Sequence, residues 1–260
     1  MKLFHIWMHD IIQKCICQNV REKKPQIWPY GKNYLIKLFC KLILIDSNEF
    51  KIIKRSLPPG VSLLAVSKGH HHESIRELFG YGQLDFGESR LQEAIPKKID
   101  LYDLKQLRWH FVGRLQKNKV RGVIKEFDYI HSVDSLSLIE RISRISLEEN
   151  KIPKIFLQVK FIEDPNKGGF LKQDLLKSWS KITSLKNINL IGLMTIPPIN
   201  LNFHQRKDLF LECRNFANQL NLKDCSMGMS NDWQEAIQAG SSWIRLGSLL
   251  FGKRQTETNC

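Results

Sequence analysis

Short apolar runs alternate with longer amphipathic stretches from about residue 49 to the end of the chain. The first run, Leu63–Val66, is typical of a strand buried on both faces, and it ends abruptly in Lys68. Seven similar runs follow. The pattern therefore predicts eight strands, at 62–67, 84–87, 108–113, 129–133, 154–160, 189–196, 224–228 and 243–246.

Stretches with the 3.6-residue period of amphipathic helices separate these strands. They predict helices at 73–79, 90–99, 117–127, 136–149, 173–184, 204–220 and 232–239, and another at 49–57 ahead of the first strand. Eight strands alternating with seven helices are what a parallel (β/α)8 barrel needs, so we expect a single α/β domain of TIM-barrel type. A doubly wound open sheet is the alternative, but no Gly-x-Gly-x-x-Gly turn opens the first helix.

The first 48 residues differ in character from the rest of the chain. They are rich in Trp and Lys, Pro25 and Pro29 interrupt any helix, and residues 34–45 form an apolar run that carries Lys37 and Lys41. This run fits an amphipathic segment on a membrane surface, an ordinary packed helix, or an extension outside the functional fold. It lacks the cleavage site of a secretory signal. We divide the chain into an N-terminal extension, 1–48, expected to be peripheral or poorly ordered, and a barrel domain, 49–260.

Composition and charge limit the classes of function. The 260 residues include 40 Lys and Arg and 26 Asp and Glu, which gives a formal charge of +14. The basic excess is spread along the chain, and no basic patch interleaved with aromatic residues predicts nucleic-acid binding. No apolar run is long enough for a membrane-spanning helix, and six cysteines without zinc-site spacing favour a reducing cytoplasm.

Polar residues gather at the ends of the predicted strands. In a barrel of parallel strands these ends converge on one mouth. Taken singly, each residue has a structural explanation, because serines cap helices, a histidine can fill a core and an arginine can pair at a rim. Their convergence favours a binding site formed by Lys68, Glu88, Ser89, His110, Asp134, Met194, Thr195, Ser230, Asn231, Asp232, Arg245, Gly247 and Ser248.

The mouth combines a lysine, an anion-binding wall and an arginine. Lys68 ends a buried strand, where desolvation lowers the pKa of an amine and makes it a nucleophile toward aldehydes. The segments 228–230 and 247–248 offer backbone N–H groups and hydroxyls to a phosphate. Arg245 can face a ring nitrogen. A pyridoxal phosphate site needs a Schiff-base lysine, a partner for the ring nitrogen and a phosphate cradle, and the sequence offers all three.

Eight motifs between about Phe50 and Arg254 follow the order and spacing of a known family: residues 65–68, 86–88, 91–93, 109–113, 115–119, 192–197, 227–232 and 244–248. They resemble the pyridoxal phosphate homeostasis proteins, also called proline synthase co-transcribed homologues, which are similar to the barrel domain of bacterial alanine racemase. The resemblance implies that Lys68 carries pyridoxal phosphate covalently and that Arg245 faces its ring nitrogen. It also implies a phosphate held by Ser230, Gly247 and Ser248, and a ring near His110, Met194 and Ser89.

The chain departs from the family pattern at three positions. Ser89 replaces the usual Asn, and Ser248 replaces the common Thr but keeps the hydroxyl. Lys160 ends the fifth strand, where the family has an uncharged residue, and competes with Lys68 for an aldehyde. We prefer Lys68 because it alone matches the three-part arrangement, and because Lys160 could as easily point outward. Three consecutive histidines, 70–72, cannot all face one ion, so we expect a loop there and no metal site.

Two interpretations of the function remain. A racemase needs bases on both faces of the cofactor, and the alanine racemases take the second from a C-terminal β domain, for which no room is left after Gly252. An arginine keeps the ring nitrogen unprotonated and so weakens the ring as an electron sink. We therefore expect a reversible carrier that serves pyridoxal phosphate homeostasis without robust catalysis; the alternatives are a racemase-like enzyme and a cofactor-free aldolase. We expect a monomer or weak dimer that delivers to apo enzymes and contacts neither nucleic acid nor integral membrane.

Overall fold

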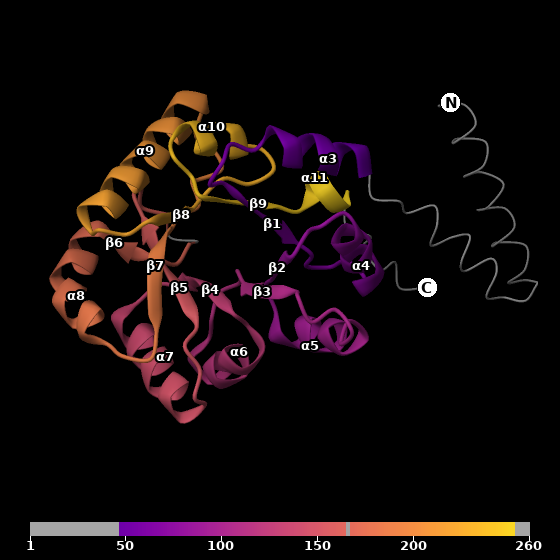
Figure 1. Ribbon diagram of the computed structural model, residues 1–260. Helices are drawn as coiled ribbons and strands as arrows, with labels where there is room; N and C mark the ends of the chain where they lie inside the picture. Colours follow the sequence, from indigo (N-terminus) through magenta and orange to yellow (C-terminus); the bar gives the residue numbers. More distant parts are fainter. Residues whose placement is uncertain (1–46, 165–166, 253–260) are drawn as a thin grey trace, which may run out of the picture. The chain divides into compact units, whose positions relative to one another are not determined.

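Eight parallel strands close into a barrel in the computed structural model, which describes residues 47–164 and 167–252 (Figure 1). Their order around the ring is β1, β2, β3, β4, β5, β7, β8 and β9, and β9 pairs again with β1. The predicted (β/α)8 barrel is confirmed. The strands are β1 (Ser62–Val66), β2 (Asp85–Glu88), β3 (Arg108–Phe111), β4 (Tyr129–Val133), β5 (Lys154–Lys160), β7 (Asn189–Met194), β8 (Asp224–Ser226) and β9 (Trp243–Leu246).

One further strand, β6 (Phe170–Leu171), pairs with the end of β5 outside this ring. The sequence did not predict it, because two residues are too few to show a period.

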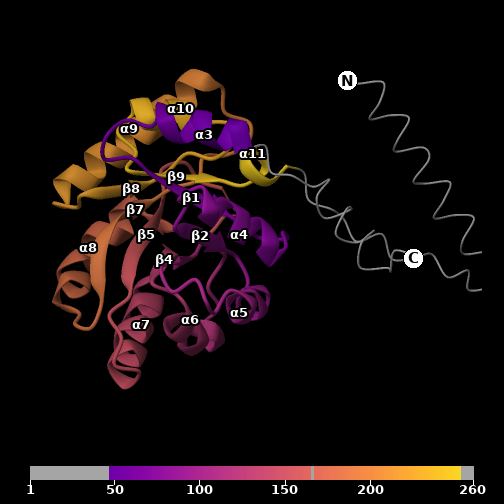
Figure 2. The same cartoon turned by 45° about the vertical axis from the view of Figure 1, so that its right-hand side comes forward.

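Helices surround the barrel (Figures 1 and 2). They agree with the predicted set except that the segment at 117–127 divides into a 3-10 helix, η1, and a short helix, α6, and that α11, after β9, was not predicted. The longest of the described helices, α9, begins at a capping box in which the Asn202 and Gln205 side chains each accept from the other's backbone N–H at 3.0 Å. The helices are α3 (Ser47–Ser56), α4 (His72–Gly80), α5 (Leu91–Asp100), η1 (Lys117–Lys119), α6 (Val120–Glu126), α7 (Leu136–Glu148), α8 (Lys172–Ser184), α9 (Phe203–Gln219), α10 (Trp233–Gln238) and α11 (Ser248–Phe251).

Alternate residues of the strands pack into two different apolar clusters. In β1, Leu63 and Ala65 join the large cluster between strands and helices, whereas Leu64 and Val66 join a small cluster inside the ring. The small cluster also contains side chains from β4, β5, β7 and β9. The strands are therefore buried on both faces, and the alternation decides which side chains point along the inside of the barrel toward its mouth.

The strands at the two ends of the chain lie side by side. β1 pairs with β9 on one side, with Leu64 opposite Arg245, and with β2 on the other, with Ala65 opposite Phe86. Residues just beyond β1 and β9, including Lys68 and Ser248, are thereby brought to the same end of the barrel.

Gly113, just beyond β3, has no room for a side chain. A Cβ atom there would lie 2.0 Å from the carbonyl oxygen of Ser89. We expect Gly113→Ala to lower the free energy of unfolding by about 3 kcal/mol, because backbone must move to relieve the clash. Gly80→Ala is the matched control in urea unfolding, since a Cβ at Gly80 meets nothing within 4 Å. Similar losses in both variants would contradict the tight contact between the ends of β2 and β3.

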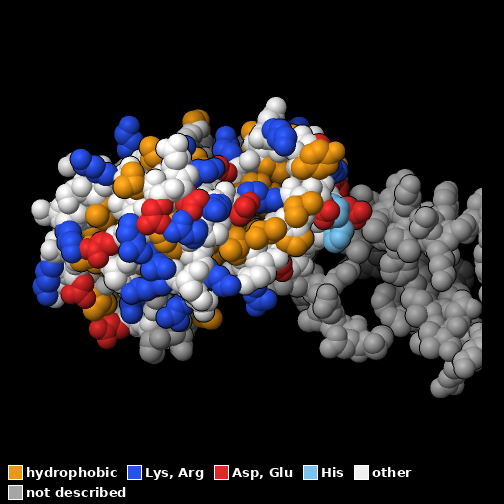
Figure 3. Space-filling model, turned by 90° about the horizontal axis from the view of Figure 1, so that it is seen from below, with side chains coloured by type: hydrophobic (Ala, Val, Ile, Leu, Met, Phe, Trp, Pro, Cys, Tyr) orange, Lys and Arg blue, Asp and Glu red, His pale blue; other side chains and the backbone are white. Residues whose placement is uncertain are grey.

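The surface and the N-terminal region bear on two other predictions. On the face seen in Figure 3, Lys and Arg side chains lie beside Asp and Glu side chains. None of the helices in the described ranges is both long and apolar enough to cross a bilayer. The prediction for the extension falls almost wholly outside the described residues, which begin with α3, two residues ahead of the helix predicted at 49–57.

Candidate functional site

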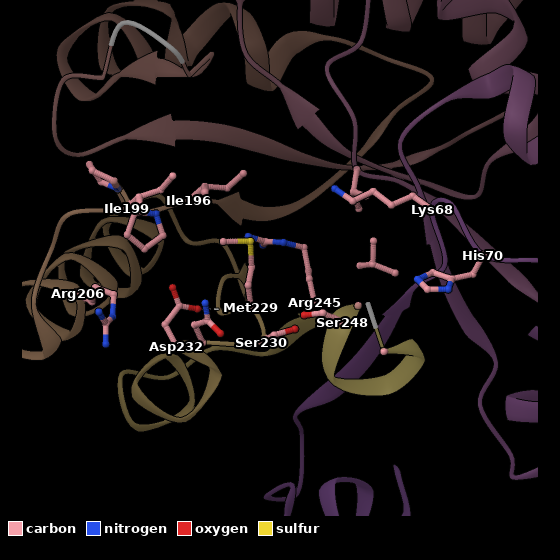
Figure 4. Close-up of a pocket in the computed structure, with 17 residues that line it drawn as sticks. Lys68, His70, Ile196, Ile199, Arg206, Met229, Ser230, Asp232, Arg245 and Ser248 are labelled. Atoms are coloured by element: carbon pink, nitrogen blue, oxygen red, sulfur yellow. Dashed lines mark hydrogen bonds between the residues drawn. The ribbon is translucent and has the colours of Figure 1, made fainter. Parts of the chain in front are cut away.

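A cavity of about 570 Å³ opens at the carboxyl end of the barrel strands. Its lining comes from β1 and β9, from residues just beyond β1, β3, β7 and β9, and from the loop after β8 (Figure 4). Seven of the residues predicted at the mouth line it: Lys68, Ser230, Asn231, Asp232, Arg245, Gly247 and Ser248. The barrel thus brings an amine, a guanidinium and two hydroxyls from distant parts of the chain to one space.

Lys68 reaches the cavity because of the phase of β1. Leu64 and Val66 point into the ring, and Lys68 continues this alternation just beyond the strand. Gly69, at a φ of +74°, begins the turn that follows, and its N–H donates to the Glu93 carboxylate at 3.1 Å. In Figure 4 the Lys68 amine points into the cavity and not away from it. The turn therefore presents the amine to whatever enters the space.

A buried ion pair secures the backbone immediately before Lys68. Lys97 of α5 donates to the Glu88 carboxylate at 2.6 Å and to the carbonyl oxygen of Ser67 at 2.9 Å. The Ser67 hydroxyl donates to the same Glu88 oxygen at 2.7 Å. Burial raises the pKa of Glu88, although Lys97 opposes the shift. The other Glu88 oxygen is buried with no hydrogen-bond partner among the described residues, so Lys97 and Ser67 are the contacts that stabilise this carboxylate.

Arg245 is held from inside the barrel. It donates to the carbonyl oxygen of Ser226 at 2.5 Å, to the Ser226 hydroxyl at 2.8 Å and to the carbonyl oxygen of Thr195 at 3.0 Å. Burial lowers the pKa of Arg245 to about 10, so the guanidinium is still charged at neutral pH. A guanidinium has five N–H donors and no acceptor. Arg245 therefore offers the cavity only donors.

Two loops form the wall across the cavity from Lys68 (Figure 4). Ser230 follows β8, and Gly247 with Ser248 follows β9. A Cβ at Gly247 would lie 3.3 Å from the carbonyl oxygen of Val66, so glycine lets the two strand ends stay close. The Ser230 and Ser248 side chains point toward the same part of the cavity. Their hydroxyl donors suit an anion.

Sequence reasoning missed part of the lining. Arg206 of α9 reaches the cavity and pairs with Glu235 at 2.6 Å, and Val112 and the segment 196–199 complete the rim. Arg206 lies on a helix face and residues 197–199 lie on a loop, where no periodicity marks them. His70, expected in a loop, also lines the cavity.

Six residues predicted at the mouth do not line this cavity: Glu88, Ser89, His110, Asp134, Met194 and Thr195. Met194 is 1% exposed and belongs to the apolar cluster inside the ring. His110 is fully buried and lies two residues before Val112, which does line the cavity, so it sits one layer deeper in the barrel. Ser89, just after β2, is also absent from the lining.

The competing lysine, Lys160, lines a separate and much smaller cavity together with Gln158 and Lys167. It follows the alternation of Phe156, which faces into the ring, so strand phase alone does not distinguish it from Lys68. The two lysines differ in the cavity they reach.

The three histidines do not share one direction. His70 stacks on Phe251 at 4.9 Å, whereas His71, His72 and Glu73 place their ligand atoms within 4.8 Å of one another near the start of α4. The exposed group has its own contacts, with His71 3.6 Å from the Glu73 carboxylate.

Comparison with known proteins places this barrel in a family. Residues 46–255 match the alanine racemase N-terminal domain family. The pyridoxal phosphate homeostasis protein of Synechocystis sp. is 44% identical over 217 residues, which cover 81% of this chain and all of the relative. That of Pseudomonas aeruginosa is 38% identical over 199 residues, 76% of this chain and 86% of the relative. The chain belongs to the pyridoxal phosphate homeostasis protein family.

Solved structures support the assignment to the pyridoxal phosphate homeostasis family. PipY of Synechococcus elongatus, solved with pyridoxal phosphate bound, is 42% identical and has a TM-score of 0.77 over 79% of this chain and 99% of its own. Alanine racemase of Clostridium difficile shares the fold at 14% identity, with a TM-score of 0.64 over 80% of this chain and 56% of its own. The resemblance seen in the motifs is confirmed.

Proposed function

We propose that this family member binds pyridoxal 5'-phosphate reversibly, with Lys68 as the Schiff-base lysine, and acts as a carrier in the homeostasis of the cofactor. The observation that carries the proposal is that the Lys68 amine, the Arg245 guanidinium and the hydroxyls of Ser230 and Ser248 line one cavity. Two further facts support it: the relatives from Synechocystis and Pseudomonas are pyridoxal phosphate homeostasis proteins, and PipY was solved with pyridoxal phosphate bound.

The chemistry of the lining fits the cofactor. A volume of about 570 Å³ is in the range of small-molecule sites. Ser230, Gly247 and Ser248 would hold the phosphate with hydroxyl and backbone donors, and Arg245 would donate to the ring nitrogen. When bound, pyridoxal phosphate supplies an aldehyde that condenses with an amine. Lys68 would provide that amine. It lies just beyond β1 and directly follows Ser67, whose carbonyl oxygen accepts a hydrogen bond from Lys97.

A carrier suits these residues better than a racemase. Arg245 is anchored on three acceptors and keeps its proton at neutral pH, so it does not protonate a ring nitrogen. An unprotonated ring draws electrons less strongly, which weakens carbanion chemistry at this site. An imine to Lys68 is reversible, which suits delivery to apo enzymes. The unbridged thiols of the buried cysteines 213 and 225 favour a reducing compartment such as the cytoplasm.

An absorbance spectrum before and after borohydride reduction tests the proposal directly. Protein incubated with pyridoxal phosphate and freed of excess ligand should be yellow, and reduction should bleach the band while fixing the cofactor to the chain. Peptide mapping should then find the label on the peptide that contains Lys68. A label on the peptide that contains Lys160, or no retained cofactor, would refute it.

A further inference from the structure

A line of hydrogen-bonded polar groups crosses the inside of the barrel below the cavity. It starts at Asp85 of β2, passes through His110 of β3 and His131 of β4 to Ser226 of β8, and ends at Arg245 of β9. The successive distances are 3.0 Å from Asp85 to His110 Nε2, 3.0 Å from His110 Nδ1 to His131 Nε2, 2.8 Å from His131 Nδ1 to Ser226 Oγ and 2.8 Å from Ser226 Oγ to Arg245 Nη1. We call these five residues the polar relay.

The two ends of the polar relay have fixed roles, one as donor and one as acceptor. Arg245 can only donate, so Ser226 Oγ accepts from it and keeps its own hydroxyl proton available for His131 Nδ1. Burial alone would raise the pKa of Asp85, but hydrogen bonds from Arg108 and His110 hold it below its ordinary value, so this carboxylate only accepts. When both imidazoles are neutral, all donors therefore point from the mouth of the barrel toward Asp85.

The same logic assigns both imidazoles. Burial lowers the pKa of His110 and of His131, although Asp85 and Asp128 favour the charged form of His110. Two neutral rings satisfy the relay in one way, with Nε2 protonated and Nδ1 bare in each. His131 Nε2 then donates to His110 Nδ1, and His110 Nε2 donates to Asp85.

Aromatic neighbours hold the rings in these planes. His110 stacks on Tyr129 with centroids 4.0 Å apart and an angle of 6° between the planes. His131 stacks on Phe156 with centroids 4.3 Å apart. A ring clamped in this way cannot rotate to seek another partner, so the relay has a single arrangement.

The lower end of the relay is tied to the floor of the barrel. Arg108 donates to both oxygens of Asp85 at 2.6 Å and lines a second cavity of about 250 Å³ beside Tyr129. The interior of such barrels is ordinarily filled by apolar side chains. Five buried polar groups are stable here because each satisfies the next, and a break at one position leaves its neighbours unsatisfied.

We propose that Asp85, His110, His131 and Ser226 are positioning residues that hold the Arg245 guanidinium in a fixed orientation toward the ring nitrogen of pyridoxal phosphate. This inference rests on the proposed function. The three hydrogen bonds of Arg245 use three of its five donors, all on the side of the barrel interior, and leave two for the cavity. The relay decides which two, because a Ser226 hydroxyl whose proton is given to His131 turns a lone pair toward Arg245 Nη1.

The assignment of the imidazoles can be tested without cofactor. Nitrogen NMR of the wild-type protein at neutral pH should show His110 and His131 as neutral rings protonated at Nε2, each identified by the signals lost in its own substitution to Gln. Protonation of either Nδ1, or an imidazolium at either position, would overturn the relay.

The effect on the cofactor can be tested by cutting the relay at Ser226. Ser226→Ala removes the hydroxyl but leaves the backbone carbonyl that also binds Arg245, so we expect pyridoxal phosphate to bind about fivefold more weakly. The pH profile of the visible absorbance should also shift. Ser132→Ala is the matched control, because Ser132 is a buried strand serine whose hydroxyl donates to the carbonyl oxygen of Gly113, outside the relay.

A second variant acts from the far end of the relay. Asp85→Asn removes the carboxylate charge at the end of the polar relay, and Asp85 does not line the cavity. We expect this variant to shift the pH profile of the visible absorbance as well. If both relay variants fold, bind with wild-type affinity and keep the wild-type profile, the relay has no positioning role. If the wild-type protein itself binds no pyridoxal phosphate, the proposed function is wrong. The NMR test of the imidazoles needs no cofactor, so its result is independent of that outcome.

Discussion

Replacing Lys68 by alanine is expected to reduce the pyridoxal phosphate retained on the protein to background and to remove its visible absorbance. Lys68 is the amine that β1 directs into the cavity. Without it no imine forms there, and only the contacts to the phosphate and the ring remain. The measurement is an absorbance spectrum after gel filtration, supported by the mass of the borohydride-reduced protein.

Lys160→Ala is the matched control for this variant. Lys160 also ends a strand and shares the inward phase, but it lines a different and smaller cavity. We expect this variant to keep its colour and the mass of the reduced adduct. Colour retained in Lys68→Ala and lost in Lys160→Ala would reverse the assignment of the Schiff base.

Lys97→Met is expected to lower the free energy of unfolding by about 3 kcal/mol, because it leaves the Glu88 carboxylate buried without its counter-charge. It also removes the bond to the Ser67 carbonyl oxygen, which anchors the residue before Lys68. Urea unfolding at neutral pH measures the loss. The double variant Lys97→Met with Glu88→Gln should recover much of it, since no buried charge is left.

The pH dependence of this loss has a defined sign. The pKa of Glu88 is raised by burial in the folded protein, and removal of Lys97 raises it further. As the pH falls through that raised pKa, Glu88 takes up a proton in the folded state and no longer needs a counter-charge. The difference between wild type and Lys97→Met should therefore shrink between neutral and mildly acidic pH. A difference that is constant or grows would contradict the role of Glu88.

The architecture could be predicted because it depends on local patterns. Eight apolar runs separated by amphipathic stretches determine a ring of parallel strands, and their ends must then meet. This is why Lys68, Ser230, Arg245 and the pair 247–248, far apart in sequence, were predicted together and are found around one cavity.

The depth of a residue within the barrel was harder to predict. His110 lies on β3 and Val112 just beyond it, in the same phase of the alternation. Val112 lines the cavity, whereas His110, two residues earlier, is buried inside the barrel. The polar relay had a visible signal, because Asp85 and His131 stand at inward positions of buried strands, where apolar residues are usual. Arg206 had none, because its contribution depends on the path of the loop before α9.

The pairing of β1 with β9 has a further consequence for stability. The barrel is closed by hydrogen bonds between its first strand, β1, and its last strand, β9. Neither strand can detach from the barrel without breaking this pairing. A ligand bonded to Lys68 and held by Ser248 would join the ends of β1 and β9. Because it binds only the folded barrel, it would by mass action stabilise the protein against unfolding that starts at either strand. Binding of pyridoxal phosphate and closure of the barrel between β1 and β9 are then linked equilibria.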